Sequence, residues 1–175
     1  MTRMDLNKKT AIATVVLGAS ARLLPHPWNF TPMVAIGLFT GAQSTRLRTG
    51  ILATLAALVL SDAALYRGAY PGWWYVYAAW LVPVLIGRVI RGREGALPIA
   101  AGALASSVSF FLLTNFMVWI TYTLYPHTLA GLAACYAAAI PFYQNQILGD
   151  AFYTAALFGG HALMLRLLQP APRTA

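Results

Sequence analysis

Long apolar runs alternate with short polar or proline-containing segments along the whole chain. Most of these runs are close to the roughly 20 residues that a helix needs to cross a bilayer, with a lower limit of about 17. The pattern predicts six transmembrane helices, over residues 8–24, 32–44, 49–66, 72–90, 96–114 and 147–168. The second run is short, but Gly37 and Gly41 within it would let neighbouring backbones approach closely. We therefore expect a tilted or partly buried helix there.

The segment between the fifth and sixth runs is too long for an ordinary connection. It contains an alanine-rich apolar stretch, 129–140, that is too short to cross a bilayer and is followed by Pro141. We expect this stretch to form a re-entrant or interfacial helix at the outer face. The predicted fold class is an all-α integral membrane protein, with a single transmembrane domain over residues 1–175.

Composition agrees with this class and excludes a soluble domain. The chain is 59% hydrophobic and only 9% charged, whereas soluble domains contain about 25% charged residues. Its 12 Lys and Arg residues outnumber its 4 Asp and Glu residues, but these cations lie at the ends of apolar runs. They do not form a basic stripe with interleaved aromatic residues, so the expected partner is the lipid bilayer and not a nucleic acid.

Lys and Arg gather in four clusters, which lie on one side of the membrane if the chain crosses it six times. Cytoplasmic loops of membrane proteins carry the excess of positive charge, and acidic residues contribute little to this rule. The clusters are Arg3, Lys8 and Lys9; Arg46 and Arg48; Arg88, Arg91 and Arg93; and Arg166 and Arg173. Both termini are therefore predicted to be cytoplasmic.

Three charged residues, Arg22, Asp62 and Asp150, are predicted at one depth near the outer ends of their helices. An ionised side chain at mid-bilayer costs about 2.5 to 3.5 kcal/mol even on the gentler insertion scales. Arg22 can therefore be expected to pair with Asp62 or with Asp150. Such a pair would either lock helix ends together or set the polarity of a binding site.

The predicted outer loops are rich in aromatic and amide side chains. Aromatic walls with a few convergent polar groups are typical of a small-molecule pocket, although Trp and Tyr also form belts at membrane interfaces. Asn and Gln are less typical of such belts, which favours binding. The candidate substrate-binding residues are Arg22, His26, Trp28, Asn29, Phe30, Asp62, Asn115, Tyr125, Asn145 and Asp150.

Catalytic and metal-binding motifs do not emerge from the sequence. The chain has no GxSxG, HExxH or P-loop pattern. His26, His127 and Cys135 could ligate a metal, but their spacing matches no standard site, so hydrogen-bonding histidines and a small buried cysteine are the preferred interpretation. We expect neither an enzyme nor a resident cofactor.

Several short motifs resemble those of an uncharacterised bacterial membrane-protein family. That family is related to the substrate-binding S-components of energy-coupling-factor vitamin transporters. The motifs are RLLPHPWNFTP from Arg22 to Pro32, Ser61-Asp62, Thr114-Asn115-Phe116, Tyr125-Pro126 and Pro141-Phe142. The resemblance implies a multi-pass protein of the bacterial cytoplasmic (inner) membrane, with a cavity that opens outward. It also implies a partner, an energising transporter module with separate ATPase subunits.

Two functions follow from the loops and the resemblance. The first is the binding and import of a small vitamin-like solute through an outward-facing pocket. The alternative is a non-transporting structural or assembly subunit, whose polar outer loops would pack against a larger membrane complex. A closed pocket of about 300 to 1,000 Å³ would favour the first function, and a flatter face the second.

Overall fold

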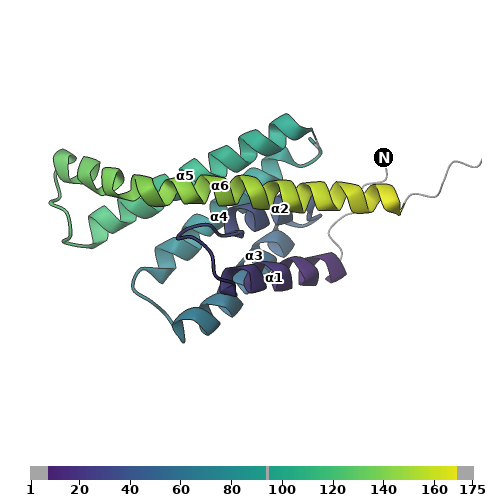
Figure 1. Ribbon diagram of the computed structural model, residues 1–175, viewed down its shortest axis with the longest axis horizontal. Coiled ribbons are helices and arrows are strands. Elements are labelled where there is room, and N and C mark those ends of the chain that lie inside the picture. The colour runs from purple at the N-terminus through teal and green to yellow at the C-terminus, as the bar shows by residue number, and fades with distance from the viewer. Residues whose placement is uncertain (1–7, 94, 169–175) are drawn as a thin grey trace, which may run out of the picture.

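The structure is a computed structural model that describes residues 8–93 and 95–168, and these residues form helices and no strands (Figure 1). The all-α class is therefore confirmed. The six helices in this part of the chain are α1 (Lys8–Leu23), α2 (Met33–Gln43), α3 (Leu47–Tyr66), α4 (Trp73–Ile90), α5 (Ala96–Thr121) and α6 (Leu129–Leu167).

Three of these helices, α3, α4 and α5, are long and apolar enough to cross a membrane. Two shorter apolar segments are Ala11–Leu23, within α1, and Met33–Gln43, which is α2. Figure 1 shows the start of α1 and the end of α6 at one end of the molecule, while the α5–α6 connection lies at the opposite end.

The short helix α2 lies at the centre of the fold, and all eleven of its residues are buried. At about 1.5 Å per residue it is roughly 16 Å long, about half the thickness of a hydrocarbon core. It packs most extensively on α4 and also contacts α1, α3, α5 and α6. Its side chains Met33, Val34 and Ile36 form the apolar core together with Ala57, Leu58 and Trp80.

Glycine makes the close packing of α2 on α4 possible. A Cβ atom added at Gly41 would lie 2.1 Å from the carbonyl oxygen of Val84, and one added at Gly87 would lie 2.2 Å from that of Leu38. These positions place backbone directly against backbone, the arrangement that small residues permit between membrane helices. The small residues of the second run therefore have the role that the sequence suggests.

The prediction of a separate re-entrant or interfacial helix over 129–140 is wrong. This stretch is the first part of α6, which continues for 39 residues with Pro141 inside it. Pro141 lacks an N–H and leaves one carbonyl of the preceding turn without its usual donor. Membrane helices tolerate such a defect, because neighbouring groups and local adjustments satisfy the freed carbonyl. At about 1.5 Å per residue, α6 is roughly 58 Å long.

The fifth helix also extends beyond its predicted end at 114, because α5 reaches Thr121. Asn115, which the sequence places in an outer loop, is thus helical, and its side-chain amide donates to the Phe111 carbonyl at 2.8 Å. The remaining connection is short, and the Thr128 hydroxyl caps α6 by accepting from the Gly131 amide at 3.1 Å. Consequently α5 and α6 form one long antiparallel hairpin.

Candidate functional site

Arg22 and Asp62 form an ion pair between α1 and α3. The Arg22 Nη1 and Asp62 Oδ1 atoms are 2.7 Å apart, with only 11% and 5% of the two side chains exposed. The same nitrogen donates to the Ser61 hydroxyl at 2.5 Å. The approach to Asp62 is not aligned as a hydrogen bond, so the contact is chiefly electrostatic. Of the two acidic partners that the sequence allows, the structure places Asp62 beside Arg22.

Tyrosine side chains surround this ion pair. The ring of Tyr70, in the α3–α4 connection, packs at a tilt against that of Tyr66, with ring centroids 4.6 Å apart. Burial, followed by the nearby negative charge of Asp62, raises the pKa of Tyr70 well above its usual value. The tyrosine therefore stays neutral beside the carboxylate. The arrangement is that of a buried charge pair that joins two helix ends, although neither Asp62 oxygen accepts a hydrogen bond.

Four expected binding residues, His26, Trp28, Asn29 and Phe30, lie in the α1–α2 connection. Their side chains do not contact the Arg22–Asp62 ion pair. The His26 ring contacts the backbone carbonyls of Pro27, at 2.9 Å, and Arg22, at 3.3 Å. Trp28 is 79% exposed. Asn29 is also exposed and adopts a left-handed backbone conformation with φ of 63°. Phe30 instead turns toward α6.

Phe30 anchors the α1–α2 connection to the middle of α6. Its ring centroid lies 6.0 Å from that of Phe152 and 5.6 Å from that of Tyr153. A Cβ atom added at Gly149 would lie 3.0 Å from the Phe30 Cα atom, so the glycine gives this connection room to approach. The connection therefore packs against the helix that carries Asp150.

The other expected residues lie on the α5–α6 hairpin. Asn115 is within α5, Asn145 is within α6, and Tyr125 is in the connection between these helices; all three are half-buried. Asp150 is on α6 and is only 3% exposed. Of the ten residues that the sequence nominates, Asp150 alone lines a cavity between α5 and α6.

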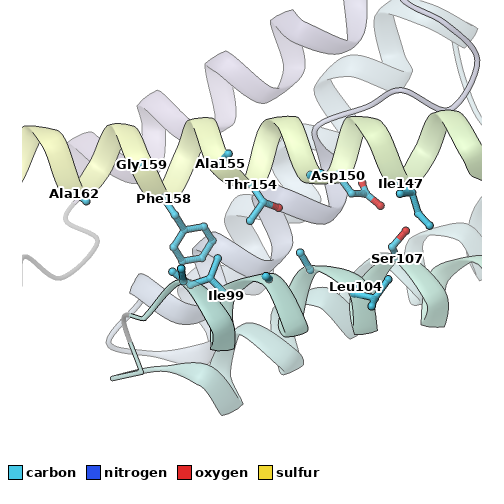
Figure 2. A pocket seen from close by; sticks show the side chains of 14 residues that line it. Ile99, Leu104, Ser107, Ile147, Asp150, Thr154, Ala155, Phe158, Gly159 and Ala162 are labelled. Atoms are coloured by element: carbon cyan, nitrogen blue, oxygen red, sulfur yellow. The ribbon is translucent and has the colours of Figure 1, made fainter.

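An open-sided cavity of about 520 Å³ lies between α5 and α6 (Figure 2), and half of the residues that line it, Leu104 and Ala155 among them, are exposed. Most of its wall is apolar and is built from alanine together with larger residues such as Ile99, Leu104 and Phe158. Three polar side chains, Ser107, Asp150 and Thr154, also line it. Figure 2 shows Ser107 and Asp150 facing each other from the two helices, with Thr154 one turn further along α6.

Hydrogen bonds organise the polar part of this cavity. The Gln146 side-chain amide donates to the carbonyl and to the hydroxyl oxygen of Ser107, both at 3.1 Å. The Ser107 and Gln146 side chains lie beside the Asp150 carboxylate. One carboxylate oxygen of Asp150, Oδ2, and the hydroxyl oxygen of Thr154 are buried without a hydrogen-bond partner. Two buried oxygen atoms of this site can therefore still accept a hydrogen bond.

Helical spacing explains why these groups meet. Gln146, Asp150 and Thr154 are four residues apart, a spacing that places side chains on one face of a helix. Sequence reasoning singled out Asp150 but missed this stripe and its partner Ser107 on α5. The spacing of these three polar residues could have indicated the site from the sequence. The alanines and glycines of the cavity wall could not, because their side chains have no functional groups.

The part of the chain that the structure describes contains no group of three or more His, Cys, Asp or Glu side chains placed to hold a metal ion. Cys135 is buried on α6, and its thiol is 3.5 Å from the Asn115 carbonyl oxygen. His127 lies in the α5–α6 connection, where its ring packs against Trp119 with centroids 5.4 Å apart.

Comparison with known proteins yields one match. Among curated proteins and among solved structures, no significant similarity to this chain is found. The match is to a family of unknown function, DUF6580, and it covers residues 4–172. Because this match extends over nearly the whole sequence, the chain belongs to the DUF6580 family.

Proposed function

We propose that this protein crosses the bacterial cytoplasmic membrane six times, with both termini inside the cell. The three long apolar helices support a membrane location. The orientation is supported by contacts between cationic connections: the Arg88 guanidinium donates to the Ser44 carbonyl at 3.2 Å, and the Arg91 guanidinium donates to the same oxygen. The α2–α3 and α4–α5 connections therefore lie together, as the excess of positive charge on the cytoplasmic side requires.

We further propose that the protein binds a small solute between α5 and α6 and imports it, as the resemblance to S-components implies. One observation carries this proposal: a cavity of about 520 Å³ that contains a buried carboxylate with an unpaired oxygen. The volume is within the range of about 300 to 1,000 Å³ that is usual for ligand pockets. Apolar walls with a few polar groups are also usual in such pockets. An unpaired buried carboxylate beside a cavity favours a binding protein over a purely structural subunit.

The binding proposal is tested by thermal unfolding of the purified full-length protein in detergent. Vitamins, cofactors and small amphiphiles are added one at a time, and a true ligand raises the unfolding midpoint with concentration. Ala155 and Ala156 are both exposed positions of α6, but only Ala155 lines the cavity. Ala155→Phe therefore adds a large side chain to the cavity wall, and Ala156→Phe adds the same side chain away from it. We expect Ala155→Phe alone to abolish the ligand-dependent shift.

Two results would contradict binding in this cavity. The first is the absence of any stabilising compound for a well-folded sample, which would favour the structural-subunit function. The second is a ligand whose effect survives Ala155→Phe unchanged, which would place the binding site elsewhere, for example among the outer loops.

A further inference from the structure

One oxygen of the Asp150 carboxylate is buried without a hydrogen-bond partner. The residue is 3% exposed and therefore has almost no contact with solvent. Ser107 and Gln146 lie beside it, but its Oδ2 atom has no hydrogen-bond partner. A buried carboxylate is stabilised by a cation or by further hydrogen-bond donors, and an incomplete set is unfavourable.

The cavity itself supplies no cation for Asp150, because no Lys, Arg or His is among the residues that line it. The Arg22 guanidinium is at Asp62. His161 is on the same helix as Asp150 but about 16 Å further along it, at about 1.5 Å per residue. Thr154 adds a second unpaired oxygen one turn from Asp150. A positively charged donor would supply both the charge and the hydrogen bonds that these two oxygens lack.

The remainder of the cavity is suited to the apolar part of a ligand. From Ile147 to Ala162, its lining follows α6 for about 22 Å at about 1.5 Å per residue. Beyond Thr154 this wall contains Ala155, Phe158, Gly159 and Ala162, and it has no further polar side chain. A phosphate or carboxylate group would find no cation there and would be repelled by Asp150, which excludes phospholipids and fatty acids as good ligands.

We infer that the cavity binds a free amphiphilic amine, whose protonated amine pairs with Asp150 and donates to Thr154. The apolar part of the ligand lies between α5 and α6 and points toward Ala162. This inference rests on the proposed function, since it names the class of solute for the same cavity.

A charge series on one eight-carbon chain tests the inference. Octylamine, octanol and octanoate are cationic, neutral and anionic at pH 7, and each is titrated into the detergent-solubilised full-length protein while the unfolding midpoint is recorded. We expect octylamine to bind about tenfold or more tightly than octanol, because a charge-assisted hydrogen bond is about twice as strong as a neutral one. Octanoate is expected to bind most weakly.

Two Asp150 variants separate charge from packing. In Asp150→Asn the preference for octylamine over octanol is expected to disappear, whereas in Asp150→Glu it is expected to remain. Ala155→Phe should weaken both ligands, and Ala156→Phe should weaken neither. If Asp150→Asn fails to fold, the wild-type charge series and the Ala155→Phe variant still decide the inference.

The possible failures are distinguishable. Equal binding of octanol and octylamine by the wild type, both sensitive to Ala155→Phe, would overturn the amine inference and leave the proposed cavity function standing. If neither compound binds and no compound of the solute panel stabilises the protein, both the amine inference and the proposed cavity function are overturned. Stabilisation by an added phosphatidylethanolamine as strong as that by octylamine would replace the free amine with a lipid headgroup.

Discussion

At the residue scale, two buried carboxylates have opposite surroundings. Asp62 lies 2.7 Å from the Arg22 guanidinium, whereas Asp150 forms no ion pair with any residue that the structure describes. The difference follows from which helices touch, because α1 packs on α3 and has no contact with α6 among the described residues. Asp62 therefore stabilises the contact between α1 and α3, and Asp150 is available to bind a ligand.

Arg22→Ala is expected to destabilise the protein by about 3 to 5 kcal/mol, because it leaves the buried Asp62 charge without its partner. The free energy of unfolding is measured by titrating a denaturing detergent into protein solubilised in a mild detergent. Arg48→Ala, which removes an exposed guanidinium on α3, serves as the control and should change stability little.

The double variant Arg22→Ala with Asp62→Ala refines this experiment. It removes both charges and is expected to be less destabilised than the sum of the two single variants. Strict additivity would show that the two side chains do not interact in the folded protein.

At the scale of the helices, the sequence pattern anticipates six apolar helices, but it also predicts a seventh over 129–140, which the structure joins to the sixth. The glycines of α2 indicate close packing, and the structure places them against α4. Pro141 misleads because proline usually ends a helix, yet here the chain continues through it. The cavity could not be predicted, because it depends on how far two alanine-rich helices separate, and no residue type encodes that distance.

Gly41→Ala is expected to destabilise the protein by about 1 to 3 kcal/mol, because overpacking forces α2 away from α4. The added Cβ would lie 2.1 Å from the Val84 carbonyl oxygen. Gly160→Ala is the matched control, since a Cβ there meets nothing within 4 Å. That control should be neutral or slightly stabilising, because alanine favours helix more than glycine does. Equal effects of the two substitutions would contradict the close α2–α4 contact.

Pro141→Ala tests the continuity of α6. In an unbroken helix, alanine restores a backbone hydrogen bond and removes a steric conflict, since proline is about 3 kcal/mol less favourable than alanine in a helix interior. The thermal midpoint is expected to rise, with helical content by circular dichroism unchanged or higher. A lower midpoint would mean that Pro141 ends a separate helix, as the sequence pattern alone suggests.

At the scale of the whole molecule, the two ends of the helical bundle differ in chemistry. One end gathers Arg88 and Arg91 around the Ser44 carbonyl. The other end includes the α5–α6 connection, where the Trp119 indole donates to the Pro126 carbonyl at 2.9 Å. Under the proposed topology, the first end faces the cytoplasm and the second faces outward.

Cysteine labelling in intact bacterial cells tests this orientation. In a Cys135→Ser background, Leu124→Cys places a thiol in the α5–α6 connection, and Arg93→Cys places one in the α4–α5 connection; both positions are exposed. A membrane-impermeant maleimide is expected to label Leu124→Cys in intact cells and Arg93→Cys only after permeabilisation. Labelling of both variants from outside, in sealed cells, would refute the proposed topology.

The complete burial of α2 also constrains how this protein is made. Eleven residues are too few to leave the translocon as an independent span, and the helix on which α2 packs most extensively, α4, is synthesised later. At about 5 to 20 residues per second, the ribosome needs several seconds to produce α3 and α4 after α2. During that interval α2 cannot pack against α4. Its final placement is therefore a late event in biosynthesis, and defects in α2 should appear in the cell first as protein lost to quality control.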